Sequence, residues 1–124
     1  MYSRNAAAVA FAMPGGEGQA APRARPVDLA HLARQTLGDR ALEQEVLQLF
    51  VQQALSARDQ IAEASPQERL RLAHNLKGSA RGVGAFAIAD CVARIETAPD
   101  DKHLIGRLSS LIDEVRDFIA AINR

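Results

Sequence analysis

Apolar residues recur at three- and four-residue steps along most of the chain, which is the repeat of a helix with one buried face. Four long stretches show this pattern, at residues 39–64, 66–81, 85–97 and 101–123, and a shorter one covers about 28–36. No stretch alternates apolar and polar residues with the two-residue period of a strand. Short links force consecutive helices to run antiparallel. We therefore predict an all-α fold, an antiparallel up-down-up-down four-helix bundle with a short extra N-terminal helix.

Residues that favour helix ends stand at the borders of these stretches. Asp28 and Asp39 can each accept hydrogen bonds from free amides in the first turn of a helix. The segment 65–68 places a capping serine, a proline at the first helical position and a glutamate that can complete a capping box. Residues 82–84, Gly-Val-Gly, are expected to form a tight reversal, and Pro99-Asp100 breaks the chain again.

The same periodicity predicts which side chains point into the bundle. They are Leu29, Leu32, Ala33, Leu42, Val46, Leu49, Phe50, Ala54, Leu55, Ile61, Leu72, Ala73, Leu76, Ala80, Ile88, Ala89, Val92, Ile95, Leu104, Leu108, Leu111, Ile112, Val115, Phe118, Ile119 and Ile122.

Composition narrows the possible partners and the compartment. Lysine plus arginine and aspartate plus glutamate number 15 each, so no overall field favours nucleic acid or an anionic membrane. The single cysteine, Cys91, cannot form an internal disulfide, and no basic or histidine pair frames it as a reactive thiol. A reducing compartment follows, and we expect a cytoplasmic monomer.

The first 26 residues differ from the remainder. They lack useful periodicity and are rich in proline and glycine, so we predict a disordered tail over 1–26 and one bundle domain over 27–124. Residues 6–13 resemble a short signal-peptide core, but no clear small-x-small cleavage site follows them closely. No apolar run approaches the roughly 20 residues that a membrane-spanning helix needs.

His74 stands out within the stretch 66–81. At about 100° of rotation per residue it lies roughly 150° from the centre of the apolar stripe, so its ring should face water. Lys77 follows one turn later, and Gly78 stands at the next position. A neutral imidazole is a good nucleophile near pH 7, and a cation one turn away would stabilise an anion attached to it. These residues suit a histidine that carries a phosphoryl group for a time.

Gly78 allows two interpretations. Glycine inside a helix costs about 1 kcal/mol relative to alanine, and close approach of a bulky group to the helix would offset that cost. Alternatively, Gly78 begins a frayed helix end that leads into Gly82 and Gly84.

Residues 74–85, H-N-L-K-G-S-A-R-G-V-G-A, resemble the signature of histidine-containing phosphotransfer (HPt) domains. That signature reads roughly His-x-Leu/Ile-Lys-Gly-Ser/Ala-Ser/Ala-x-x-x-Gly-Ala and matches over all twelve positions, and the flanking helices fit across about 27–124. The resemblance implies a four-helix bundle whose exposed histidine accepts a phosphoryl group from the aspartate of one receiver domain and passes it to another.

The resemblance also implies roles for individual side chains. His74 would be phosphorylated, Lys77 would neutralise the added charge, and Gly78 would admit the phosphoryl group and the partner. Glu96 stands where several relatives have a glutamine that orients the histidine ring, although it could also pair with Arg94 or Arg69 on the surface. The family needs no cofactor of its own, and Mg²⁺ is expected in the partner receiver domain.

The expected partners are receiver domains of response regulators and of hybrid histidine kinases, which present acidic residues around their aspartate. Arg71 and Arg81 flank His74 and, with Lys77, would form a small basic patch of matching sign. Leu70 lies near the same exposed side as a candidate docking contact, and Asn75 is the next residue after the histidine.

Three other functions fit the sequence less well. Asn75 cannot act as the acidic base found beside the histidine of many ATP-dependent kinases, and the chain lacks a P-loop, so autophosphorylation is not expected. A non-catalytic module could dock receivers without carrying phosphate, but it would not need the imidazole. A metal site of His31, His74 and His103 lacks any pair at helical ligand spacing.

Overall fold

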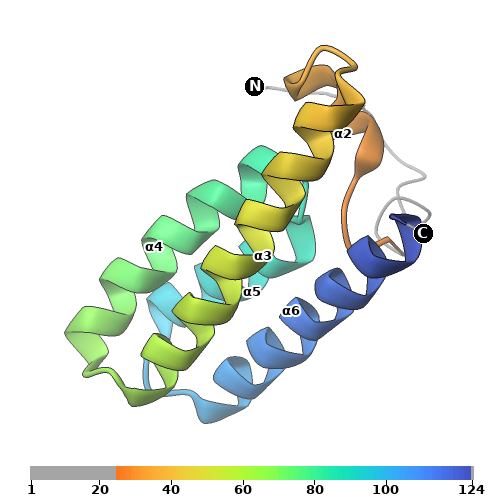
Figure 1. Cartoon of the computed structure of the whole chain (residues 1–124). Coiled ribbons are helices and arrows are strands. Elements are labelled where there is room, and N and C mark those ends of the chain that lie inside the picture. Colours follow the sequence, from red (N-terminus) through yellow and green to blue (C-terminus); the bar gives the residue numbers. More distant parts are fainter. Residues whose placement is uncertain (1–24, 124) are drawn as a thin grey trace.

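The computed structural model describes residues 25–123, which contain five helices and no strand. Their bounds are α2 Leu29–Gln35, α3 Arg40–Glu63, α4 Pro66–Val83, α5 Phe86–Thr97 and α6 Lys102–Ile122. The prediction of an all-α chain is confirmed (Figure 1). The predicted tail falls almost wholly on residues 1–24, outside the described part.

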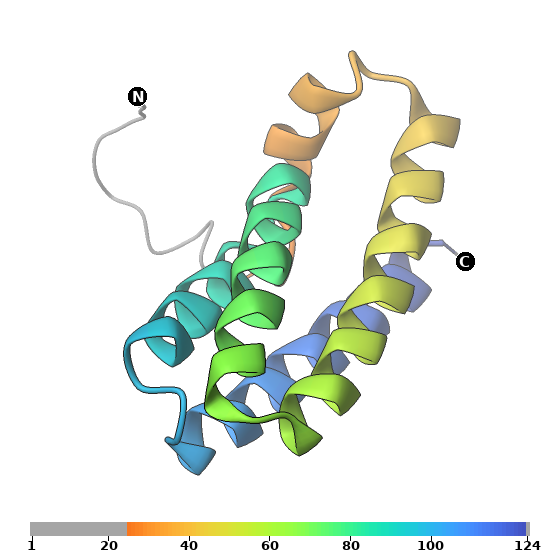
Figure 2. The same cartoon turned by 90° about the vertical axis from the view of Figure 1, so that its left-hand side faces the viewer.

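The four long helices form a closed ring of neighbours. α3 packs against α4, α4 against α5, α5 against α6, and α6 back against α3, so α4 and α6 are diagonal to each other. Figures 1 and 2 show each helix running back along the one before it, and the short α2 lies at the end of the bundle where α3 begins. The structure is the predicted up-down-up-down bundle with one extra short helix.

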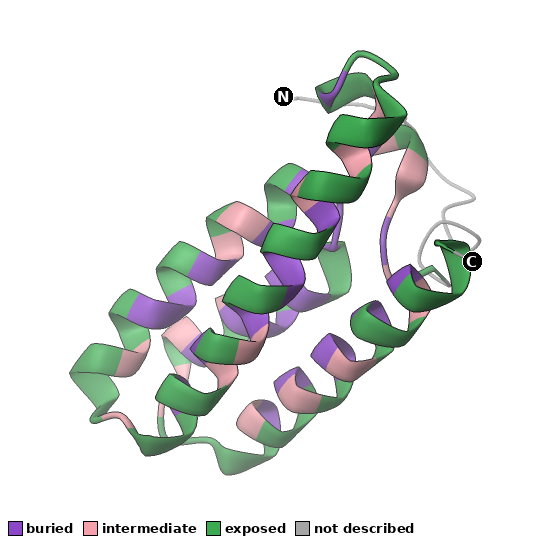
Figure 3. Ribbon diagram, viewed as in Figure 1, coloured by how far each residue is buried: buried purple, intermediate pink, exposed green. Residues whose placement is uncertain are grey.

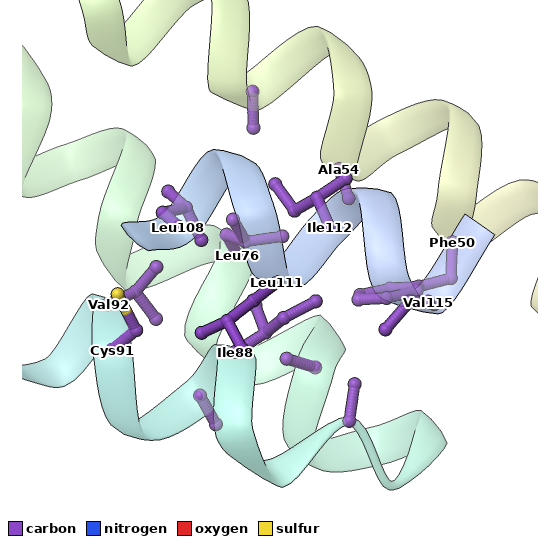
Figure 4. Close-up of a cluster of buried hydrophobic side chains, with 14 of the residues drawn as sticks. Phe50, Ala54, Leu76, Ile88, Cys91, Val92, Leu108, Leu111, Ile112 and Val115 are labelled. Carbon is purple, nitrogen blue, oxygen red and sulfur yellow. The ribbon is translucent and has the colours of Figure 1, made fainter. Parts of the chain in front are cut away.

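The core lies along the inner faces of these helices, where Figure 3 shows the buried residues. Leu76, Ile88, Val92, Leu108 and Ile112 come from α4, α5 and α6 and are almost completely buried (Figure 4). Full burial of one such side chain contributes roughly 1.5–3 kcal/mol relative to exposure. The apolar face of α4 is therefore fixed in the bundle, and this fixes the direction of its opposite face.

Three residues predicted to point inward are exposed. Leu42, Leu49 and Ile122 face solvent, and Leu49 is 63% exposed. The inner face of α3 is centred instead on a row that includes Leu47 and Val51 (with Phe50, Ala54, Ala57 and Ile61), so Leu42 and Leu49 lie to one side of it. Ile122 is the last residue of α6 and is near the end of the bundle. Leu29, Ala33, Val46, Leu55 and Phe118 are only partly buried.

The helix starts follow the predicted caps. The carboxylates of Asp28 and Asp39 accept hydrogen bonds from the amides of His31 and Leu42, each at 3.0 Å. The Ser65 hydroxyl accepts from the amide of Glu68 at 3.3 Å. The Glu68 carboxylate bonds to Arg71 instead of reaching back to complete a capping box.

The end of α4 differs from the prediction by two residues. The helix continues through Gly82 and ends at Val83, and the reversal is made at Gly84, whose φ is +90°. The amide of Ala85 closes the turn on the carbonyl of Ala80 at 2.8 Å, as in a helix end with a left-handed glycine. The Gly84 carbonyl accepts from the amide of Asp28 at 2.9 Å, which attaches the start of α2 to this turn.

Replacing Gly84 by alanine is expected to destabilise the bundle by about 1–3 kcal/mol, because φ is positive there and the new Cβ would lie 2.9 Å from the carbonyl oxygen of Asp28. Urea unfolding followed by circular dichroism measures the change. Gly82→Ala is the matched control: a Cβ at Gly82 meets nothing within 4 Å, so this helical substitution should stabilise by up to about 1 kcal/mol. Equal effects of the two substitutions would contradict this account of the turn.

Candidate functional site

His74 lies on the outer face of α4, opposite the face that packs in the core. Its neighbours Leu72, Ala73 and Leu76 are buried, whereas the His74 side chain is 72% exposed. The same pattern that anchors the helix therefore presents the imidazole to solvent. A ring in this position can be reached by a group on another protein.

The Glu96 carboxylate connects His74 to Lys77. The Nδ1 atom of His74 lies 3.2 Å from Oε2 of Glu96, and the Nζ atom of Lys77 donates to Oε1 of the same carboxylate. Glu96 comes from the last turns of α5, where the buried Val92 and Ile95 fix the helix against the core. The side chains of Lys77 and Glu96 are only 18% and 21% exposed, so this ion pair is shielded more than His74 is.

These contacts determine the protonation of the neutral ring. The hydrogen bond from Lys77 is the main reason that the pKa of the Glu96 carboxyl lies below its usual value, and the hydrogen bond with His74 acts in the same direction. An ionised carboxylate only accepts hydrogen bonds, so Nδ1 must carry the proton that points to Glu96. The lone pair of a neutral His74 is therefore on Nε2, away from the carboxylate.

Of the two contacts that the sequence allowed for Glu96, with the His74 ring or with a surface arginine, the structure has the first. Glu96 binds His74 rather than a surface arginine: Arg69 donates to the carbonyls of Ile61 and Pro99, at 2.7 and 3.0 Å, and is used in holding the helix links. Arg94 is exposed on α5 and has no hydrogen bond or ion pair to Glu96.

Gly78 is an ordinary helical residue with empty space above it. A Cβ built at this position meets nothing within 4 Å, and α4 continues well past it to Val83. The helix is therefore not frayed here, and packing within the described chain gives no reason for a glycine. Its cost of about 1 kcal/mol relative to alanine is better explained by a group that approaches from outside.

The predicted basic patch is smaller than expected. Arg71 forms an exposed ion pair with Glu68 on its own helix, and Lys77 is paired with Glu96. Of the three cations, Arg81 alone makes no side-chain ion pair with the described residues. The positive charge of the patch is reduced because Glu68 stands one turn from Arg71 on α4 and Glu96 reaches Lys77 from α5.

Leu70 is exposed, as its predicted place near the same side of the helix as His74 requires, and Asn75 is exposed as well. Gly82, which the sequence predicts to lie in a turn, is helical, and a Cβ there would also meet nothing within 4 Å. His74, Gly78 and Gly82 are spaced by four residues, so they follow one another along one face of α4. This spacing can be read from the sequence. It predicts that the face of α4 on the C-terminal side of His74 carries no side chain at positions 78 and 82.

The single cysteine and the two other histidines do not take part in this site. Cys91 is buried, its thiol donates to the carbonyl of Leu104 at 3.4 Å, and burial raises the pKa of that thiol. His31 packs edge-on against Phe86, with ring centroids 5.2 Å apart. His103 is in the exposed first turn of α6. Residues 25–123 contain no group of three or more histidine, cysteine or acidic side chains arranged to hold a metal ion.

Within the described part of the chain, no helix has the length and apolar character required to cross a membrane.

A helical bundle with one exposed, carboxylate-held histidine beside a lysine and a glycine defines the class of this protein. The family model of the Hpt domain matches residues 45–122, more than half of the chain, and the chain belongs to that family. No curated protein and no solved structure is significantly similar to it. Hpt domains act in two-component signalling, where they interact with receiver domains in phosphorelays, and a phosphotransfer-related role follows for this chain.

Proposed function

We propose that His74 accepts a phosphoryl group from the aspartate of one receiver domain and relays it to the aspartate of another. The observation that carries this proposal is the hydrogen bond of 3.2 Å between His74 Nδ1 and Glu96, on a side chain that is otherwise open to solvent. It supports the role because it fixes one ring nitrogen and leaves the other available to attack.

In the proposed step the Nε2 lone pair attacks the phosphorus of an aspartyl phosphate. The P–N bond forms as the P–O bond to the aspartate breaks, and the electron pair of that bond returns to the carboxylate. The ring keeps its Nδ1 proton, which remains shared with Glu96. Both compounds are reactive, so the step is reversible and needs mainly positioning and charge from the protein.

Lys77 and Gly78 have complementary roles in this scheme. Lys77 lies one turn from His74 and supplies positive charge for the phosphoryl oxygens. Gly78 leaves the approach to the ring open. Mg²⁺ would be bound by the receiver domain, and no cofactor of this chain is needed.

The docking surface would surround His74 on the outer face of α4. We assign it Leu70, Arg71, Asn75 and Arg81, with receiver domains of response regulators and hybrid histidine kinases as partners. The ion pair between Arg71 and Glu68 is exposed to solvent and therefore contributes little to stability, so an acidic partner can replace Glu68 at low cost. A monomer suffices, since every named residue comes from one chain.

A phosphoryl donor assay tests the proposal. Receiver domains that carry a radiolabelled aspartyl phosphate are mixed with the protein, and we expect label on the protein in an acid-labile, base-stable form. The alternative, a docking module without phosphate transfer, predicts a stable complex in the same mixture and no label on this chain. ATP alone should give no labelling, because the role proposed here needs no kinase activity.

A further inference from the structure

The ion pair between Lys77 and Glu96 has a consequence for the transfer equilibrium, provided that the proposed phosphorylation of His74 occurs. Two cations lie within one turn of His74 on α4, and both are already bonded: Arg71 to Glu68, and the Nζ atom of Lys77 to Glu96. The side chains of Lys77 and Glu96 are about four-fifths buried, so water screens this pair less than it screens an exposed pair. Lys77 must therefore weaken its bond to Glu96 before it can bind another anion fully.

A phosphoryl group on Nε2 adds about two negative charges next to this pair. The other basic side chains on the same face are less suited to neutralise them, because Arg71 is bonded to Glu68 and Arg81 stands two helical turns away. Two anions, the phosphoryl group and the Glu96 carboxylate, then share a single ammonium group. The ammonium group has three donors and can bond to both anions, but its single positive charge is then divided between them, so each anion is stabilised less than it would be alone.

The direct effect of Glu96 on the phosphorylated ring is smaller, because two terms oppose each other. Phosphorylation with retention of the Nδ1 proton makes the ring cationic close to the carboxylate, which is attractive. The phosphoryl oxygens place two negative charges further from the carboxylate, which is repulsive. Since Coulomb energy scales with charge and inversely with distance, the two terms largely cancel and the contest for Lys77 decides the sign.

We propose that Glu96 competes with the phosphoryl group on His74 for Lys77, and that this competition keeps the transfer equilibrium on the side of the receiver aspartate. Transfer back to the receiver breaks the P–Nε2 bond and re-forms the P–O bond to the aspartate carboxylate, after which Lys77 regains Glu96. Glu96 is thus a positioning residue that also makes the phosphohistidine a better phosphoryl donor.

The test substitution is Glu96→Gln, which keeps the shape and the acceptor oxygen for His74 but removes the charge. We expect the equilibrium ratio of phosphohistidine to aspartyl phosphate to rise by about three- to tenfold, less than the full effect of one charge-assisted hydrogen bond because the phosphoryl group stands on an exposed ring. The ratio is measured with one purified receiver domain at fixed total phosphate, approached from both directions. A side chain that only orients the ring would change forward and reverse rates together and leave this ratio unaltered.

Two further variants separate the competing explanations. Asp113→Asn removes a carboxylate on α6 that pairs with Arg58 of α3 and with Arg116. Since α6 is diagonal to α4, this variant should leave the ratio unchanged. In a Lys77→Met background, Glu96→Gln should lose most of its effect because no ammonium remains to compete for. Persistence of the full effect in that background would attribute it to direct repulsion and overturn the competition.

The outcomes also separate this inference from the proposed function. If wild-type protein takes no label from any receiver, the proposed function fails. If the wild type and Glu96→Gln are both labelled, but the ratio of phosphohistidine to aspartyl phosphate is the same or lower in the variant, then phosphotransfer stands and the competition for Lys77 is rejected.

Discussion

Replacing His74 by glutamine is expected to abolish phosphoryl transfer from a receiver domain, leaving no label on the protein. Glutamine has no nucleophilic nitrogen, so the P–N bond cannot form, whereas the amide can still reach the Glu96 carboxylate. The free energy of unfolding should change by no more than about 0.5 kcal/mol, because the His74 side chain is 72% exposed. Labelling is measured by autoradiography after gel electrophoresis, and stability by urea unfolding.

The matched control is His103→Gln. His103 is also an exposed histidine, but it lies in the first turn of α6, the helix diagonal to α4. This variant should be labelled as fast as the wild type. Residual label on His74→Gln at the wild-type level would mean that another side chain carries the phosphoryl group.

Replacing Gly78 by leucine is expected to change stability and transfer in opposite directions. The helix gains roughly 1 kcal/mol, because leucine has a much higher helix propensity than glycine and its Cβ meets nothing within 4 Å. The transfer rate should fall by about 100-fold or more, because the new side chain occupies the approach to Nε2 and displaces the partner's phosphorus by an ångström or more. Single-turnover transfer from one labelled receiver measures the rate.

Gly106→Leu is the control for this pair of effects. Gly106 is likewise an exposed helical glycine whose Cβ would meet nothing, but it belongs to α6. It should stabilise the protein by a similar amount and leave the transfer rate unchanged. A Gly78→Leu protein that transfers normally would show that the space above this glycine is not used by the partner.

The helix pattern could be predicted from the sequence because local signals agree there. Asp28, Asp39, Ser65 and Asp101 each cap a helix in the structure, and each precedes an apolar repeat that continues to the next break. The sequence did not determine which face of α3 is buried. Leu42 and Leu49 fit the helical repeat as well as Leu47 and Val51 do, and only packing against α4 and α6 decides which row is buried.

The candidate site also has features that the sequence predicts and features that it does not. The exposure of His74 follows from its angle to the apolar face of one helix, which is a local property. The shared carboxylate depends on α4 and α5 lying side by side and on the conformation of a long lysine side chain, and neither is determined by local spacing. For the same reason the sequence predicted a basic patch, where the structure places Glu68 and Glu96 against two of its three members.

The central claim is that Glu96 holds Nδ1 of His74 and leaves Nε2 to form the phosphoryl bond. Nuclear magnetic resonance of the phosphorylated protein, with ¹⁵N in the histidine ring, identifies the nitrogen that is bonded to phosphorus. We expect a single phosphohistidine, at His74, with phosphorus on Nε2 and a proton retained on Nδ1 beside Glu96. Phosphorus on Nδ1, or on His31 or His103, would contradict the account.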